Sequence, residues 1–263
     1  MRIWVADGVR GLMARQEGGW RTLGPPGTAL CLFRGGVFCA GERQAFFYAG
    51  ASGRMADGFA AEGGVCAMVC RVEVLYTLSA DAGCLTAREI GGGGPLFSAP
   101  VGKDPRSLSV RGGSLAVADG AEGRILFFDR QLRRQGCIRL PGPACGVCLL
   151  AGGAAALCGA EEGARFLSIG RHGGTEEIFR CPNRPCCLAR RGRGFAVGSR
   201  GAVFFVAPDG GVLGVRKCVW PGAARPNAGK TLICDSGGGQ VLLEDGRRLY
   251  AGPAPEDALI LPG

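Results

Sequence analysis

Apolar and polar residues alternate along this chain in short runs, the pattern of β-strands that bury one face. The stretch after Pro105 shows it best. There "SLSV" ends at Gly112-Gly113, "SLAVAD" leads into a polar turn, "GRILFFD" comes next, and "CIRLPGP" closes the unit. A Gly-Gly pair can adopt the positive φ angles of a two-residue hairpin turn. The pattern predicts four short antiparallel strands within roughly forty residues.

The same unit recurs along the chain. "RGGSLAVADGAEGRILFFD" from Arg111, "AGGAAALCGAEEGARFLSI" from Ala151 and "RGRGFAVGSRGAVFFVA" from Arg191 share its internal order. Shorter or more divergent copies begin at residues 34, 72 and 229, and the opening "MRIWVADGVRGLMARQ" is a seventh. A repeat of about forty residues with four strands is typical of a β-propeller blade.

The two ends of the sequence complete one unit. The final "DALILPG", placed before the initial "MRIWVADG", reproduces the pattern of "SLSVRGG" followed by "SLAVADG". A ring of blades has to close, because its first and last sheets otherwise expose unpaired edges. We therefore predict an all-β fold, a single seven-bladed β-propeller domain of four-stranded antiparallel blades over residues 1–263. The C-terminal strand Leu259–Leu261 is expected to pair with the N-terminal strands of residues 2–24 and close the ring.

The units "VADG" with "G.I.FFD", and "FAVGSRGAVFFVAPDGGVLG", resemble the YVTN-type repeats of bacterial seven-bladed β-propellers, and the resemblance covers essentially the whole chain. The tetrapeptide itself differs, since "VADG" and "CAGE" stand where that family has "YVTN". The resemblance implies the fold and includes lactonase-like relatives. Propellers of this kind serve as binding platforms, as lactonases and as domains of larger redox proteins, so it implies no single function.

Composition adds an expected location and a question about thiols. No apolar run approaches the roughly 20 residues of a membrane helix, and the first residues lack the pattern of a secretory signal. We expect a cytoplasmic monomer.

Most of the 14 cysteines lie in apolar runs such as "ALCLF" and are expected to be buried. Four of them could form a thiol cluster near the channel mouth, and the sequence leaves its use open: Cys145, Cys148, Cys186 and Cys187.

The sequence contains few candidates for catalysis. In a propeller, the loops between the second and third strands of each blade lie on one face, here called the top face. These loops carry acids that either bond their own turn amides or attract a cation: Asp7, Glu42, Asp81, Asp119, Glu122, Glu161, Glu162 and Asp235. The single histidine, His172, is expected in a turn on the opposite face. We expect no catalytic residue, metal or cofactor. The alternative is a lactonase-like hydrolase with a divalent cation at the top-face channel mouth.

The charge of the chain favours a binding role. The net charge is +9, from 31 Lys and Arg against 22 Asp and Glu. The loops between the first and second strands, and between the third and fourth strands, share the bottom face. The predicted turns place these basic residues there: Arg2, Arg15, Arg34, Arg54, Arg71, Arg111, Arg130, Arg133, Arg134, Arg171, Arg190, Arg191, Arg193, Lys230, Arg247 and Arg248.

A basic face of this kind predicts a non-enzymatic scaffold that recognises a protein or peptide partner, preferably an acidic one. Nucleic acid is less expected, because neither stacking aromatics nor a groove-reading element is evident. The alternative that these arginines only solvate the surface stays open. The partner-binding candidates come from three adjacent predicted blades and are expected to lie close together: Arg111, Arg133, Arg134, Arg190, Arg191 and Arg193.

Overall fold

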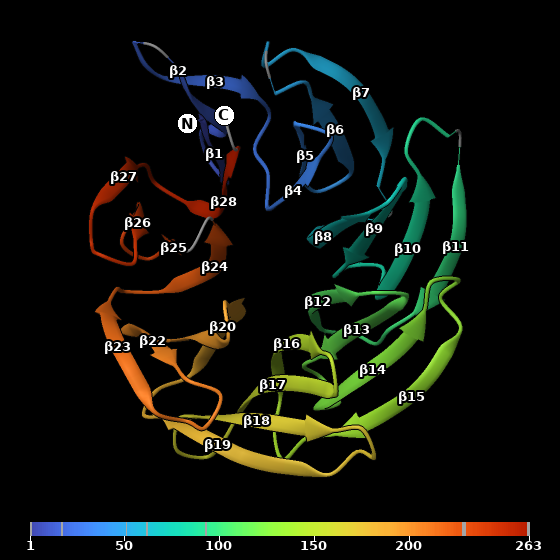
Figure 1. Ribbon diagram of the computed structural model, residues 1–263. Helices are drawn as coiled ribbons and strands as arrows, with labels where there is room; N and C mark the ends of the chain where they lie inside the picture. The colour runs from blue at the N-terminus through green and yellow to red at the C-terminus, as the bar shows by residue number, and fades with distance from the viewer. Residues whose placement is uncertain are drawn as a thin grey trace.

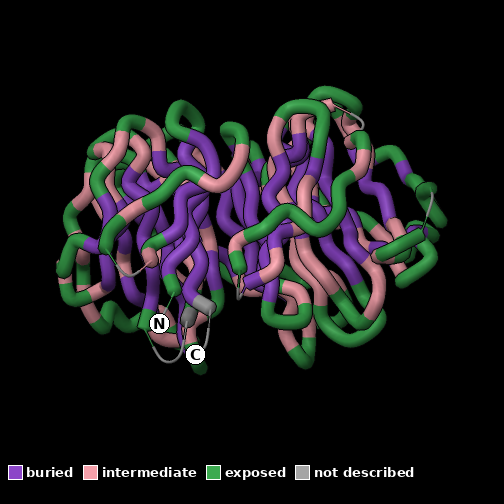
Figure 2. Tube along the Cα trace, turned by 90° about the horizontal axis from the view of Figure 1, so that it is seen from above, coloured by how far each residue is buried: buried purple, intermediate pink, exposed green. Residues whose placement is uncertain are grey.

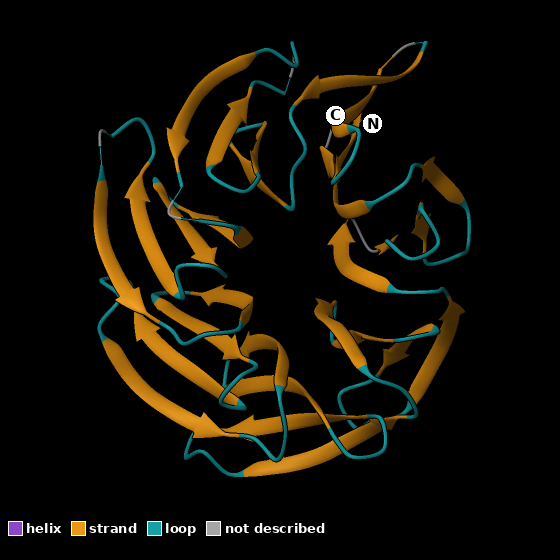
Figure 3. Ribbon diagram, turned by 180° about the vertical axis from the view of Figure 1, so that it is seen from behind, coloured by secondary structure: helices purple, strands orange, loops and turns teal. Residues whose placement is uncertain are grey.

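The computed structural model describes residues 2–16, 18–50, 52–61, 63–92, 94–227 and 230–261. The predicted unit start at Gly229 and the last two residues therefore lie outside the described part. Seven antiparallel sheets of four strands stand in a ring (Figure 1). The regular structure of the described ranges is β throughout (Figure 3), and they hold no helix long and apolar enough to cross a membrane. The predicted fold class is confirmed.

We name the sheets A to G in order around the ring and give the strands of each from the channel outward. The first four are sheet A, β28 (Pro255–Leu261), β1 (Arg2–Asp7), β2 (Gly11–Gln16) and β3 (Gly19–Gly24); sheet B, β4 (Ala29–Phe33), β5 (Gly36–Ala40), β6 (Gln44–Tyr48) and β7 (Met55–Ala60); sheet C, β8 (Val65–Arg71), β9 (Val74–Ser79), β10 (Cys84–Glu89) and β11 (Pro95–Pro100); sheet D, β12 (Pro105–Arg111), β13 (Ser114–Asp119), β14 (Arg124–Asp129) and β15 (Arg134–Arg139). The other three are sheet E, β16 (Ala144–Leu150), β17 (Gly153–Gly159), β18 (Ala164–Gly170) and β19 (Thr175–Cys181); sheet F, β20 (Pro185–Arg191), β21 (Gly194–Ser199), β22 (Ala202–Val206) and β23 (Val212–Lys217); sheet G, β24 (Pro221–Asn227), β25 (Lys230–Asp235), β26 (Gln240–Leu243) and β27 (Arg248–Ala251).

Sheets stack face to face, so the second strand of each blade is covered on both sides. In β13 the run Leu115–Asp119 is buried throughout, although its sequence alternates in size. Leu78 and Leu85 of sheet C pack with Leu115 and Leu126 of sheet D in one apolar cluster. Burial is accordingly concentrated between the blades, while the loops of both faces are exposed (Figure 2). The two faces are therefore where this fold offers side chains to a partner.

The ring closes as the sequence predicts. β28 pairs antiparallel with β1, with Trp4 opposite Leu259 and Arg2 opposite Leu261. The N and C ends lie beside each other in sheet A (Figure 1). Leu259 joins Trp4 in the cluster between sheets A and B. One sheet is thus built from both ends of the chain.

An ion pair joins three inner strands where the ring closes. Asp257 of β28 accepts hydrogen bonds from Nε of Arg225 at 2.8 Å and from the backbone amide of Leu30 at 2.9 Å. Arg225 belongs to β24, and its guanidinium also donates to the Leu30 carbonyl at 3.4 Å. The Asp257 side chain is 3% exposed. A single buried carboxylate therefore links sheets G, A and B through hydrogen bonds.

Candidate functional site

The six predicted binding arginines belong to two sheets. Arg111, Arg133 and Arg134 lie in sheet D, whereas Arg190, Arg191 and Arg193 lie in sheet F. Sheet E stands between these two sheets in the ring (Figure 1). The expectation that the six come from three adjacent blades is therefore wrong, because sheet E contributes none of them.

Arg191 and Arg190 have different surroundings from the other four. Arg191 donates from two guanidinium nitrogens to the two carboxylate oxygens of Glu244, at 2.9 Å each, and its guanidinium lies over the ring of Phe205. Its charge is therefore already matched within the protein. Arg190 lines the central channel. Of the predicted set, only Arg111 lines the bottom-face hollow between sheets D and E.

Other cations of this face are paired as well. Arg34 forms an ion pair with Glu73, and Lys230 lies 3.9 Å from Asp245. The guanidinium groups of Arg71 and Arg111, in contrast, have no hydrogen-bond or ion-pair partner within the described ranges. Arg71 ends β8 of sheet C and Arg111 ends β12 of sheet D, so two guanidinium groups without a carboxylate partner stand at corresponding positions of neighbouring blades.

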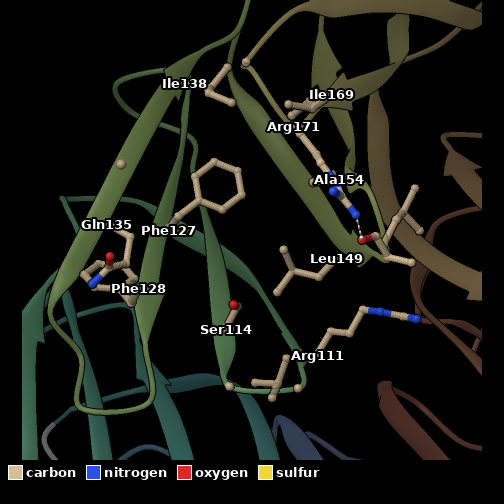
Figure 4. Close-up of a pocket in the computed structure, with 18 of the residues that line it drawn as sticks. Arg111, Ser114, Phe127, Phe128, Gln135, Ile138, Leu149, Ala154, Ile169 and Arg171 are labelled. Carbon is tan, nitrogen blue, oxygen red and sulfur yellow. Dashed lines mark hydrogen bonds between the residues drawn. The ribbon is translucent and has the colours of Figure 1, made fainter.

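A groove of about 1070 Å³ opens on the bottom face between sheets D and E. Apolar side chains form part of its walls: Phe127 and Ile138 come from sheet D, and Leu149 and Ile169 come from sheet E. Figure 4 shows Phe127, Ile138 and Leu149 pointing into the same space from different strands. The groove can therefore receive an apolar side chain.

Arginines line the same groove, and no carboxylate does within the described residues. Arg111 reaches it from the end of β12, and Arg171 reaches it from the turn after β18. Arg71 of sheet C is the third. Arg171 donates to the Ala151 carbonyl at 3.5 Å, a contact between two turns of sheet E on one side of the hollow (Figure 4). The result is an apolar groove with cations on both sides.

The groove exists because small residues replace large ones along its walls. Gly136 of β15 pairs with Phe127, and no atom lies within 4 Å of the position that a Cβ would take there. On the facing sheet the wall continues with Ala151, Gly153 and Ala154. Arg71, Arg171 and these small residues were not among the predicted site residues. The glycine in "RQGCIR" was the only sequence feature that indicated the hollow. A glycine within a strand is equally typical of a bulge, so the sequence alone does not predict a groove there.

The central channel gathers the four thiols predicted to cluster. Cys145, Cys148, Cys186 and Cys187 all line one cavity of about 610 Å³. Burial raises the pKa of Cys148 and of Cys186 to about 12, and burial also raises the pKa of Cys145. These thiols are therefore protonated near neutral pH, whereas metal binding and thiol exchange need the thiolate. The described ranges hold no group of three or more metal-ligating side chains.

Two of the top-face acids, Asp7 and Asp235, hold their own loops. Oδ1 of Asp7 accepts the amides of Val9 and Arg10 at 2.9 Å each, and Oδ2 accepts the Tyr250 hydroxyl at 2.8 Å. Burial opposes ionisation of Asp7, yet these hydrogen bonds outweigh it and hold the pKa below its usual value. Asp235 likewise accepts the amides of Trp220 and Gly238. The structural interpretation of these two acids is confirmed.

Asp119 differs from that pattern, because Nε of Arg124 donates to its Oδ2 at 3.0 Å. Adding calcium, magnesium or manganese is expected to shift the melting temperature by less than about 1 °C, since the buried carboxylates Asp7, Asp119 and Asp235 already have partners. Thermal unfolding followed at increasing cation concentration measures this. A saturable rise of several degrees with one cation would instead support the hydrolase alternative.

Comparison with known proteins shows the fold and no family. The sequence matches no protein-family model and no curated protein. Among solved structures, it is similar to the WD40 β-propeller domain of Doa1, with 9% identity, a TM-score of 0.74, and coverage of 88% of this chain and 85% of that one. BBS1N in complex with ARL6DN is 16% identical with a TM-score of 0.70, over 89% and 83% of the two chains.

A putative 6-phosphogluconolactonase from Bacteroides uniformis is a further structural neighbour, with 13% identity and a TM-score of 0.72 over 98% of each chain. The identities are low, so these likenesses establish a seven-bladed propeller with WD40 and lactonase-like neighbours. They do not transfer a function, because one propeller fold hosts many. The YVTN-type resemblance stays a prediction.

Proposed function

We propose that this protein is a binding platform, a cytoplasmic monomer that holds an acidic segment of a partner protein on its bottom face and catalyses no reaction. The observation that carries the proposal is the groove between sheets D and E, where Arg71, Arg111 and Arg171 stand without a carboxylate among the described lining residues. Unmatched guanidinium groups that converge on one hollow attract and orient carboxylates. The structural neighbours support a binding role, since BBS1N was solved with the protein partner ARL6DN.

Two further points support binding over catalysis. Among the top-face acids, Asp7 and Asp235 accept backbone amides of the loops, and Asp119 pairs with Arg124. Burial raises the pKa of the channel thiols Cys145, Cys148 and Cys186, so these thiols are protonated near neutral pH. On the quoted motifs we also propose a relation to YVTN-type propellers.

The triple variant Arg71→Glu, Arg111→Glu, Arg171→Glu tests the platform. We expect it to bind a fluorescent all-glutamate peptide at least about tenfold more weakly than the unmodified protein at low salt, because attraction becomes repulsion. Its melting temperature should change by only about 2 °C, since these side chains are exposed. Fluorescence anisotropy at low and high salt measures the first effect, and thermal unfolding measures the second.

The matched control is Arg43→Glu, Arg184→Glu, Arg200→Glu. These three exposed arginines lie in top-face loops and give the same change in net charge. The control should keep most of the binding. An equal loss in both variants would contradict the proposal, because net charge alone would then explain the affinity.

A further inference from the structure

The groove between sheets D and E has apolar walls as well as charge. Phe127, Ile138 and Leu149 are only partly buried, and they face the unfilled space between the two sheets. Apolar surface of this kind gains free energy when a ligand covers it. If the arginines only kept the surface solvated, nothing would explain why partly exposed apolar side chains lie between them. An acidic segment alone would therefore leave the walls of the groove uncovered.

Register places the cations in a row. Arg71 pairs with Val74 and Arg111 pairs with Ser114, each as the last pair of its hairpin. The corresponding residue of β16 is Leu150, which pairs with Gly153. Going around the ring, two guanidinium groups are thus followed by an apolar side chain at the same level. Arg171 stands on the far side of the groove, in the turn between the third and fourth strands of sheet E.

We infer that the groove takes a short acidic peptide segment that carries a bulky apolar side chain, an inference that rests on the proposed function. That side chain packs against Phe127, Ile138 and Leu149, while carboxylates on either side of it meet Arg111 and Arg171. Such a ligand matches both properties of the groove, the apolar walls and the cations on both sides. A bulky side chain that fills a pocket at the centre of an interface usually contributes a large share of the binding free energy.

Gly136 allows the apolar part to be tested separately from the charge. A side chain at this position would point from the wall of sheet D into the groove, and nothing lies within 4 Å of its Cβ. Gly136→Trp should therefore fill the groove without disturbing the fold or removing an arginine. Gly94→Trp is the matched control, because Gly94 lies in a bottom-face turn of sheet C and its Cβ also meets nothing within 4 Å.

The experiment compares two labelled peptides by fluorescence anisotropy. One is the all-glutamate peptide, and the other replaces two of its glutamates with leucine and phenylalanine. We expect the apolar replacement to strengthen binding at least about tenfold despite the lost charges. Gly136→Trp should remove that gain and leave the affinity for the all-glutamate peptide within about twofold, while Gly94→Trp changes neither.

Four outcomes would overturn the inference. If the two peptides bind equally well, or if Gly136→Trp still binds the apolar-acidic peptide more tightly than the all-glutamate one, the groove does not recognise apolar side chains. The proposed binding of an acidic segment would still stand. If neither peptide binds, the proposed function fails and the inference fails with it. If single-stranded oligothymidine displaces the apolar-acidic peptide at a lower concentration than the unlabelled peptide does, the cations serve a nucleic acid instead.

Discussion

Ending the chain at Asp257, which removes residues 258–263, is expected to lower the melting temperature by more than about 10 °C or to abolish cooperative unfolding. The deletion removes Ala258, Leu259 and Ile260, which are buried and pack against sheets A, B and G. Loss of each large apolar side chain costs about 2–5 kcal/mol, a large fraction of the stability of a typical domain. Thermal unfolding followed by circular dichroism measures the effect.

A circular permutant distinguishes ring closure from simple loss of residues. It joins the last residue to the first through a short flexible linker and opens the chain between Gly112 and Gly113, in an exposed hairpin turn. Because sheet A keeps all four strands, the permutant should melt within a few degrees of the unmodified protein. A truncated protein that melts within about two degrees of the intact one would show that the last strand does not close the ring.

Asp257→Ala is expected to cost about 3 kcal/mol, or roughly 6–12 °C in melting temperature. The change leaves the Arg225 guanidinium with only the Leu30 carbonyl at 3.4 Å, and it leaves the Leu30 amide without its acceptor. We place the cost at the lower end of the range for a broken buried pair, because the Arg225 side chain is 35% exposed to the channel. Urea unfolding at neutral pH gives the free-energy difference.

The double variant Arg225→Met, Asp257→Ala is the control for this ion pair. Removing both charges takes away the uncompensated guanidinium, so the double variant should recover part of the stability that Asp257→Ala loses. If the double variant lost as much stability as Arg225→Met and Asp257→Ala lose together, the two residues would act independently. That result would contradict the role of Asp257 as the carboxylate that joins sheets G, A and B.

The blades and their closure could be predicted because they depend on local and repeated features. Hairpin turns such as Gly112-Gly113 are read directly from neighbouring residues, and Gly112 indeed has a φ of +60°. The order of strands is then set by the repeat. The match between the two ends of the chain also predicted the pairing of β28 with β1, because each end supplies the part of one repeat unit that the other end lacks.

The site was only partly predictable, because it depends on contacts between sheets. Arg191 could not be recognised as neutralised, since its partner Glu244 lies 53 residues away in the next blade. The groove arises from missing side-chain volume at Gly136 and in the facing wall, and a repeat pattern does not report how well two sheets fill the space between them. Arg111 was identified because its turn position is set by the repeat.

Photo-crosslinking from the groove tests the central claim most directly. A photoreactive amino acid replaces Gln135, which is exposed at the groove (Figure 4), and the control carries it at Arg43 on the top face. We predict that irradiation in lysate gives discrete adducts with acidic proteins from position 135 only, and that adding Arg71→Glu and Arg111→Glu removes them. The same adducts from both positions, or adducts that survive the charge reversal, would contradict a binding platform at this groove.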